Sequence, residues 1–439
     1  MFIERHLALK REAIIILKSY CKNIVISDVC YIKDCVLDCL DKKYNKSKTI
    51  GFLARYENLP KSFVRHLYDL FGVDGVMFIV EHIAKDMSQH IQNHDVELPP
   101  IRFVERYDSN SGKVREIGVE HMLQQCYEYV AVNACQEMFN RKIGRYQCAS
   151  IPGKGQLYGV RAIQRWIDRD PGSTKYFVKL DVRKCYPSIQ HDKIKKYIHR
   201  DIKNDDLLYL LDLLIDSFSE GGLSIGSHLS QWLCNYYLSY AYHYMEQNLF
   251  TTKTKVKRRL ISHQLFYMDD ILLCGQNKRH LKMAVEMTVD FFKNELGLEI
   301  KPNWGIQRFV YFDKKRNKER GCFIDMMGYK IYRDRITIRK SVFIKIARKL
   351  RRINKKIDNH IPVSLKDART MCSYYGYIVH TNSKHLKDKY QVDRCMRISR
   401  NIISRDIKLI NYRKMVRIYK LERRKGAFYE QYLQNVNAA

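Results

Sequence analysis

Three aspartates carry the clearest chemical signal in this sequence. Asp181 ends a short apolar run, KYFVKLDV, and Asp269 and Asp270 stand side by side between the apolar runs LFYM and ILLC. Most Asp-Asp pairs are solvated turns, but two adjacent carboxylates between buried strands are costly unless cations neutralise them. The apolar flanks therefore favour a divalent-cation site over a solvated turn.

Carboxylates in this pattern suit nucleotidyl transfer. That reaction needs a nucleophilic 3′-hydroxyl and a triphosphate whose charge is neutralised, and two Mg²⁺ ions roughly 4 Å apart achieve both. Mg²⁺ prefers a few carboxylates together with phosphate oxygens and water. The protein must then direct carboxylates from separate elements at one point. A strand that ends at Asp181 and a hairpin whose turn carries Asp269 and Asp270 would do this.

The surrounding pattern predicts an α+β fold. Residues 1 to about 95 show helical spacing, notably in residues 9–21 and 63–87, and two prolines then mark a boundary. A Ser-Asn-Ser-Gly cluster predicts a hairpin over residues 103–119. Further on we expect a helix over 121–139, a strand over 175–182, a helix from about 192, a helix over 230–245, two strands over 262–275, a glycine-capped helix over 277–297 and a hairpin over 326–340.

The charge of the chain predicts a polyanionic partner. The formal net charge is +32, from 79 Lys and Arg against 47 Asp and Glu, and such an excess repels itself in the folded protein. Residues 340–439 hold 25 Lys and Arg against 7 Asp and Glu, which favours a helical region that grips a duplex backbone. An anionic membrane surface is the alternative partner, but no segment resembles a basic amphipathic anchor.

Several features predict a cytoplasmic protein that does not enter a membrane. The 13 cysteines include no C-x-x-C pair, which favours free thiols in a reducing compartment. Charges interrupt the N-terminal region where a signal peptide needs an apolar run. The sequence contains no run of 18 apolar residues, so we expect no membrane span.

Five segments resemble, in order, the palm motifs of reverse transcriptases. They are FVKLDVRKCYPSI, GLSIGSHLSQWLCNYYLS, LFYMDDILL, LGLEIKPN and MMGYKIY, and SGKVREI before them resembles a fingers motif. The resemblance implies a right-hand polymerase fold. We expect a helical N-terminal extension over 1–97, fingers over 98–175, a palm over 176–340, and a basic helical thumb and C-terminal region over 341–439.

The resemblance also implies roles for the residues that match these motifs. Two Mg²⁺ ions, with Mn²⁺ able to substitute, would be held by Asp181, Val182, Asp269 and Asp270. Lys301 would protonate the leaving pyrophosphate, and an exposed lysine without a role is the alternative.

Further matching positions concern the nucleotide and the primer. Tyr186 would exclude a 2′-hydroxyl and so select deoxynucleotides, unless it is simply a core tyrosine. Lys113 and Arg115 would bind the triphosphate, with a solvated hairpin face as the alternative. The hairpin at Gly328 and Tyr329 would grip the primer end.

The segment GLSIGSHLSQ departs from the commoner retroviral pattern. Its Ile-Gly and Ser-Gln pairs resemble diversity-generating reverse transcriptases of bacteria, whose template pocket tolerates mispairing, so accurate synthesis is in question here. Gln231 would form part of the nucleotide pocket, or would instead cap or anchor its helix.

The leading hypothesis is a bacterial or phage RNA-directed DNA polymerase that copies a dedicated non-coding RNA in antiphage defence. We expect RNA template, DNA product and dNTPs as partners, with an accessory protein or a second copy left open. The alternatives are an error-prone diversity-generating enzyme, a catalytically idle RNA-binding protein and an RNA-dependent RNA polymerase. Priming from a hydroxyl such as that of Tyr429 or Tyr432 is a further possibility.

Overall fold

The structure is a computed structural model that describes residues 19–41, 43–44, 46–108, 112–218, 221–253 and 256–422. Most of the helix expected over residues 9–21 falls outside these ranges, as do Tyr429 and Tyr432. The prediction is wrong at the end of that helix, because Tyr20 forms a parallel β-bridge with Ile202 instead.

Helices build the N-terminal region, as expected. Asp28 caps α2, the first helix within the described residues, by accepting a hydrogen bond from Tyr31 N–H. The helical spacing over residues 63–87 is broken at Gly72, which has a φ of +66° and lets the chain turn. The elements are α2 (Val29–Leu40), α3 (Ser47–Tyr56), α4 (Lys61–Phe71), the 3₁₀ turn η1 (Asp74–Val76) and α5 (Met77–Asn93).

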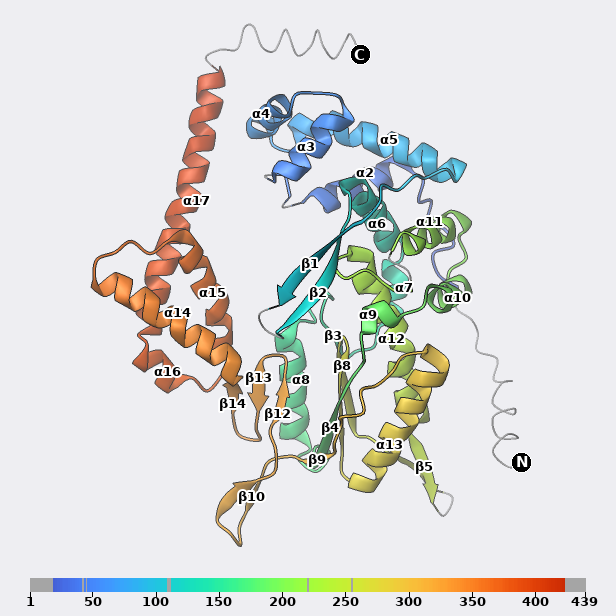
Figure 1. Cartoon of the computed structure of the whole chain (residues 1–439), viewed down its shortest axis with the longest axis vertical. Coiled ribbons are helices and arrows are strands. Elements are labelled where there is room, and N and C mark those ends of the chain that lie inside the picture. Colours follow the sequence, from blue (N-terminus) through green and yellow to red (C-terminus); the bar gives the residue numbers. More distant parts are fainter. Residues whose placement is uncertain are drawn as a thin grey trace.

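The expected hairpin over residues 103–119 is confirmed. Strands β1 (Arg102–Asp108) and β2 (Lys113–Val119) pair antiparallel, with Arg106 opposite Arg115. The single helix expected over 121–139 is instead two helices, α6 (Met122–Ala134) and α7 (Gln136–Lys142), which meet at Cys135. Figure 1 shows the hairpin extending from the N-terminal helices toward the central sheet and the C-terminal helices.

A five-stranded sheet lies at the centre of the chain. Its strand order is β3-β7-β8-β4-β9, and the two strands that were expected to carry the aspartates, β4 and β8, are neighbours in it. Figure 1 shows α8 on one side of this sheet and α12 and α13 on the other. The strands are β3 (Gln147–Cys148), β4 (Tyr176–Asp181), β7 (His263–Tyr267), β8 (Asp270–Gly275) and β9 (Gln307–Arg308).

Helices around the sheet follow the expected spacing. The predicted glycine cap is confirmed, because Gly297 takes a left-handed conformation where the helix after β8 ends. The elements are α8 (Gln156–Arg169), α9 (Cys185–Ser188), α10 (His191–Asp201), α11 (Asp205–Asp216), α12 (His228–Asn248), α13 (Lys278–Phe291) and a π-helical turn (Phe292–Leu296).

The hairpin expected over residues 326–340 is part of a larger unit. An additional strand precedes it, so β12 (Ile324–Met326), β13 (Tyr329–Ile331) and β14 (Ile336–Ile338) form a three-stranded sheet. Two short hairpins lie elsewhere on the surface: β5 (Phe250–Lys253) with β6 (Val256–Arg259), and β10 (Tyr311–Asp313) with β11 (Lys318–Arg320).

Basic helices follow residue 340, as predicted. Asp367 is buried between two of them and accepts hydrogen bonds from Lys349 at 2.9 Å and Lys356 at 2.8 Å. The last helix extends past the other three and contacts α4 (Figure 1). These helices are α14 (Lys340–Asp358), α15 (Leu365–Val379), α16 (Lys384–Lys389) and α17 (Val392–Glu422).

Three hydrophobic cores hold these parts together. One core runs from α2 through α6 and α12 to the end of α13, so the N-terminal helices share their interior with one face of the central sheet. A second core joins α8 to the other face and to the β12–β14 sheet. The basic helices have a third core of their own. Within the described ranges, no helix has both the length and the apolar character that a membrane crossing requires.

Candidate active site

Strand pairing brings the three aspartates to one edge of the central sheet. Asp181 is the last residue of β4, Asp270 is the first of β8, and the two are direct partners in the antiparallel ladder. Asp269 lies in the two-residue turn between β7 and β8, after Met268, whose φ is +53°. Asp181 and Asp270, 89 residues apart in the sequence, therefore present their carboxylates from adjacent strand ends.

The turn that carries Asp269 is held by three neighbouring segments. Val182 N–H donates to the Asp269 carbonyl at 3.0 Å, and Met268 N–H donates to the Cys148 carbonyl at 3.3 Å. The amide of Asn235, on α12, lies 3.3 Å from the Met268 sulfur. We did not identify Asn235 from the sequence, and its only signal there was a polar residue within an otherwise apolar helix.

The carboxylates lie close enough to disfavour one another's charge. Burial, followed by the charge of Asp270, raises the pKa of Asp269, and burial likewise raises the pKa of Asp270, with a further contribution from Asp181. Asp269 nevertheless keeps one side exposed to solvent, so its desolvation is partial. Negative charge concentrated at this edge is what a bound cation would relieve.

Lys301 lies at the same edge. The Lys301 ammonium group contacts the Asp181 carboxylate, and the backbone N–H of Lys301 donates to the Asp181 backbone carbonyl at 2.9 Å. Beside it, Val182 pairs with Ile300 in an isolated antiparallel bridge. The sequence prediction placed Lys301 near the leaving group, and the structure places it on the first carboxylate.

The donor types fit Mg²⁺, but the ligands are not assembled around one point. Among the residues with a described position, no group of three or more His, Cys, Asp or Glu side chains is arranged to hold an ion. Asp181 is instead neutralised by Lys301. The metal site at Asp181, Val182, Asp269 and Asp270 therefore stays a prediction.

Tyr186 lies next to the carboxylates. It belongs to the short helix α9. The residue before this helix, Lys184, has a left-handed backbone conformation. Its ring packs partly buried against the first core. Burial and the neighbouring thiols of Cys234 and Cys185, with a smaller effect of Asp269, raise the pKa of the Tyr186 hydroxyl. The ring is therefore a packed residue whose hydroxyl lies within electrostatic reach of Asp269.

The β1–β2 hairpin brings a cation to the aspartates from outside the sheet. The positive charge of Arg115 lowers the pKa of Asp269 and so offsets a part of the increase that burial causes. Lys113 is the first residue of β2, and its side chain lies outside the described part of the structure.

The comparisons with known proteins bear on this arrangement. Residues 106–303 match the family described as "Reverse transcriptase (RNA-dependent DNA polymerase)", and this range includes Arg115, Lys301 and all three aspartates. Residues 106–303 form a reverse transcriptase domain. The hairpin at Gly328 lies beyond the end of the matched range.

Other comparisons add little to the family match. No curated protein sequence matches the chain significantly. Among solved structures, the chain is similar to apo telomerase from Candida tropicalis truncated from its C-terminal domain, with 12% sequence identity and a TM-score of 0.34. That similarity covers 61% of this chain and 66% of the telomerase chain.

In the reverse transcriptase domain, the segment GLSIGSHLSQ leads into α12. Ser227 caps the helix by accepting from Ser230 N–H at 3.0 Å, so the alternative that Gln231 caps it is wrong. The buried carboxylate of Glu128 accepts from Ser227 Oγ at 2.8 Å and from two backbone N–H groups of the first turn. Gln231 is half-buried in that turn. We did not anticipate Glu128 from the sequence.

The predicted primer grip lies between the domain and the basic helices. Gly328 has a φ of +84°, and a Cβ there would lie 3.0 Å from the ring of Tyr377 on α15. The Tyr329 ring is only 2% exposed and packs on Tyr377 at a centroid distance of 5.2 Å. A contact with a primer at this hairpin would therefore come from its backbone, because the tyrosine ring belongs to the second core.

One basic residue near this hairpin was missed. Arg339 donates to Asp325 at 2.5 Å, and its charge also opposes the raised pKa of Asp270. The backbone N–H of Arg339 donates to the Gly328 carbonyl at 2.9 Å. It thus links the hairpin to the carboxylates, and nothing in the local sequence around Arg339 distinguished it from the other basic residues of this region.

Proposed function

We propose that the chain is an RNA-directed DNA polymerase that adds deoxynucleotides to a primer 3′-hydroxyl. The observation that supports this best is the pairing of Asp181 with Asp270, with Asp269 in the adjoining turn. Carboxylates on adjacent strand ends suit a shared pair of Mg²⁺ ions, with Mn²⁺ able to substitute. When bound, the two ions would supply charge neutralisation for the triphosphate and activation of the hydroxyl.

The chain's own residues would divide the remaining work. Asp181, Asp269, Asp270 and the Val182 backbone would hold the ions. Arg115, whose charge already reaches Asp269, would bind the triphosphate together with Lys113. Lys301 would leave Asp181 and donate a proton to the departing pyrophosphate.

Other residues would select the sugar of the nucleotide and position the nucleotide and the primer. The Tyr186 ring beside Asp269 would occupy the space that a 2′-hydroxyl requires. Gln231, in the first turn of α12, would contact the nucleotide pocket. The backbone at Gly328 and Tyr329 would hold the primer end.

Replacing one carboxylate tests the polymerase proposal. Asp269→Asn keeps the size of the side chain but removes its charge, so we expect dNTP incorporation in a primer-extension assay to fall by about 10³-fold or more. RNA affinity should change less than about threefold, because most of the basic surface is intact. Asp290→Asn on the exposed face of α13 is the matched control and should extend primers normally. Full extension by Asp269→Asn would refute the metal assignment.

The same experiment separates an active polymerase from an idle RNA-binding protein. An idle protein would bind RNA but show no incorporation in its natural form. The presence of all three aspartates at one sheet edge favours the active enzyme.

We propose antiphage defence as the biological role, with a dedicated non-coding RNA as template. A helical extension and basic C-terminal helices would suit a defence-associated reverse transcriptase, whereas the Ser-Gln pair at Ser230 would suit a diversity-generating one. Sequencing of the nucleic acid that co-purifies with the protein distinguishes the roles. One structured RNA with its complementary DNA supports defence, and copies of a repeat that carry scattered substitutions support diversification.

A further inference from the structure

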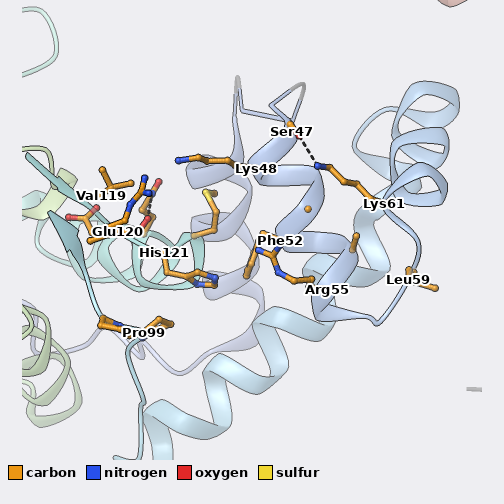
Figure 2. A pocket seen from close by; sticks show the side chains of 16 residues that line it. Ser47, Lys48, Phe52, Arg55, Leu59, Lys61, Pro99, Val119, Glu120 and His121 are labelled. Atoms are coloured by element: carbon orange, nitrogen blue, oxygen red, sulfur yellow. Dashed lines mark hydrogen bonds between the residues drawn. The ribbon is translucent and has the colours of Figure 1, made fainter. Parts of the chain in front are cut away.

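A cavity of about 820 Å³ lies away from the aspartates, between α3 and α4 on one side and the foot of the β1–β2 hairpin on the other. Figure 2 shows side chains from both walls around it, with Lys48, Arg55 and Lys61 on the side of the N-terminal helices and Val119 to His121 opposite them. Its size falls within the range of small-molecule sites in proteins.

Four cationic side chains line this cavity, and its acidic wall residue is neutral. Lys48, Arg55, Lys61 and Arg102 are exposed, and none of them has an ion-pair partner within the described part of the chain. Burial and the neighbouring Glu128 raise the pKa of Glu120 to about 9, so this carboxyl group is protonated at neutral pH. The cavity therefore concentrates positive charge without an internal counter-ion.

Two of these cations converge on one point. Gly51 has no side chain, and a Cβ there would lie 3.6 Å from Arg55 Nη1 and 3.8 Å from Lys61 Nζ. Lys61 also donates to Ser47 Oγ at 2.7 Å, a hydrogen bond drawn in Figure 2. Like charges held this close repel one another unless an anion lies between or above them.

The first turn of α3 adds hydrogen-bond donors to the same place. Ser47 and Lys48 open the helix and line the cavity, and the side chain of Lys46, at the cap position, makes no hydrogen bond to this end. The first N–H groups of a helix lack intrahelical partners and carry the positive end of its dipole. Cationic side chains, free backbone donors and a bare glycine together match the requirements of a phosphate group.

Part of the cavity is apolar. Phe52, Leu59 and Met122 line it, and His121 packs edge-on against Phe52 at 5.6 Å between ring centroids. Burial, with Arg55 nearby, lowers the pKa of His121, so its ring is neutral and adds to this apolar side at neutral pH. A phosphate alone would leave this surface unused, whereas a nucleotide would cover it with its base or sugar.

We propose that this cavity is a second nucleotide-binding site, which holds a phosphate between Arg55 and Lys61 and places the nucleoside against the half-buried side chains of His121 and Met122. The nucleotide is either free or part of a single-stranded RNA, since both present the same chemistry. The site does not depend on the polymerase assignment, because none of its residues belongs to the carboxylate cluster.

Binding to the full-length protein tests this proposal. Fluorescent ATP and a fluorescent six-nucleotide single-stranded RNA are titrated separately in EDTA, which removes metal-dependent binding at the aspartates. We expect Arg55→Gln with Lys61→Gln to weaken at least one probe by about tenfold or more. Lys196→Gln with Arg279→Gln removes two exposed cations elsewhere and should change binding less than about twofold. Inorganic triphosphate should compete with the bound probe.

The outcomes separate the two sources and the two sites. Selective loss of ATP binding identifies a free nucleotide, and selective loss of RNA binding identifies a strand. Loss of ATP binding in EDTA on Arg115→Gln, with no loss on Arg55→Gln with Lys61→Gln, would place the bound nucleotide at the aspartates and overturn the proposal. The proposal is overturned if both probes respond equally to the cavity variant and the control variant. If Arg55→Gln with Lys61→Gln lowers the melting temperature, a second double variant replaces it. Lys48→Gln with Arg102→Gln, from other parts of the lining, must then weaken binding of the same probe.

Discussion

Single residues at the sheet edge combine favourable and costly features. Burial raises the pKa of Asp269 and of Asp270, so the charged form of both carboxylates costs more free energy in the folded protein than in water. Lys179, Arg339 and Lys301 oppose this increase at Asp270, and Arg115 opposes it at Asp269. Charge that is retained at a structural cost is typical of functional sites.

Tyr186 gives the sharpest test at the residue scale. Truncation in Tyr186→Ala opens space beside Asp269, so we expect ribonucleotide incorporation relative to deoxynucleotide incorporation to rise by about tenfold or more. Single-nucleotide extension with matched rNTP and dNTP measures the ratio. Tyr186→Phe keeps the ring and should keep the selectivity. If the ratio does not change in Tyr186→Ala, then the tyrosine is only a packed residue or the enzyme makes RNA.

At the scale of elements, the chemistry depends on how turns and hairpins are held. The Met268–Asp269 turn is fixed by β4, β3 and α12 together, and the β12–β13 turn is fixed by α15. Neither turn would keep its geometry as an isolated hairpin, because its partners come from distant segments.

The turn at Gly328 predicts a position-specific substitution effect. Gly328→Ala must adopt a positive φ and would bring a Cβ to 3.0 Å from Tyr377, so we expect a loss of roughly 1–3 kcal/mol in unfolding free energy. Primer extension should weaken as well, since the hairpin shifts. Gly376→Ala, in a helix with no neighbouring atom in reach, is the control and should be neutral or stabilising. Equal melting temperatures for Gly328→Ala and the parent protein would contradict this account.

Asp367 predicts a pH-dependent contribution of the basic helices. Hydrogen bonds from Lys356 and then Lys349 lower the pKa of Asp367, so its contribution is present above the ordinary carboxyl pKa of about 4 and is lost as the pH falls below it. Asp367→Asn should cost about 1–3 kcal/mol at pH 7. Thermal unfolding at pH 7 and below pH 4 measures this.

The control for Asp367 is an acidic residue on the surface of the same region. Asp388→Asn, on the exposed side of α16, should leave the melting temperature nearly unchanged. A constant difference between Asp367→Asn and the parent protein across this pH range would exclude the two lysine contacts as its cause.

At the scale of the whole molecule, charge is distributed unevenly. The basic helices α14 to α17 have their own core, lie beside the β12–β14 sheet and reach back to α4 (Figure 1). A surface of this kind suits the phosphate backbone of a duplex without selecting its sequence.

The whole-molecule prediction concerns salt. If six to ten phosphates are neutralised, affinity for an RNA–DNA duplex should fall by about 10³- to 10⁵-fold between 50 and 200 mM salt. Binding titrations at a series of salt concentrations measure the slope. Removing two cations with Arg351→Gln and Arg352→Gln should reduce its magnitude, whereas Lys196→Gln with Arg279→Gln should not. Affinity that is independent of salt would exclude a backbone-gripping surface.

The sequence by itself determined the elements that carry the chemistry. The apolar runs before Asp181 and around Asp269 and Asp270 predicted strands with aspartates at their ends, and β4, β7 and β8 confirm them. The hairpin at residues 103–119 and the glycine cap at Gly297 were equally readable. These features depend on local spacing and turn chemistry, which neighbouring residues are sufficient to express.

Only the tertiary structure decided which of these elements meet. That Lys301 lies on Asp181, that Asn235 supports the Met268 turn, and that Tyr329 is buried against Tyr377 all depend on contacts between distant segments. The split at Cys135 and the third strand of the β12–β14 sheet were missed for the same reason. The cavity beneath Gly51 is also invisible in the sequence, because its walls come from α3, α4 and the foot of a hairpin more than 40 residues further along the chain. Packing brings such groups together, and packing is a property of the folded chain as a whole.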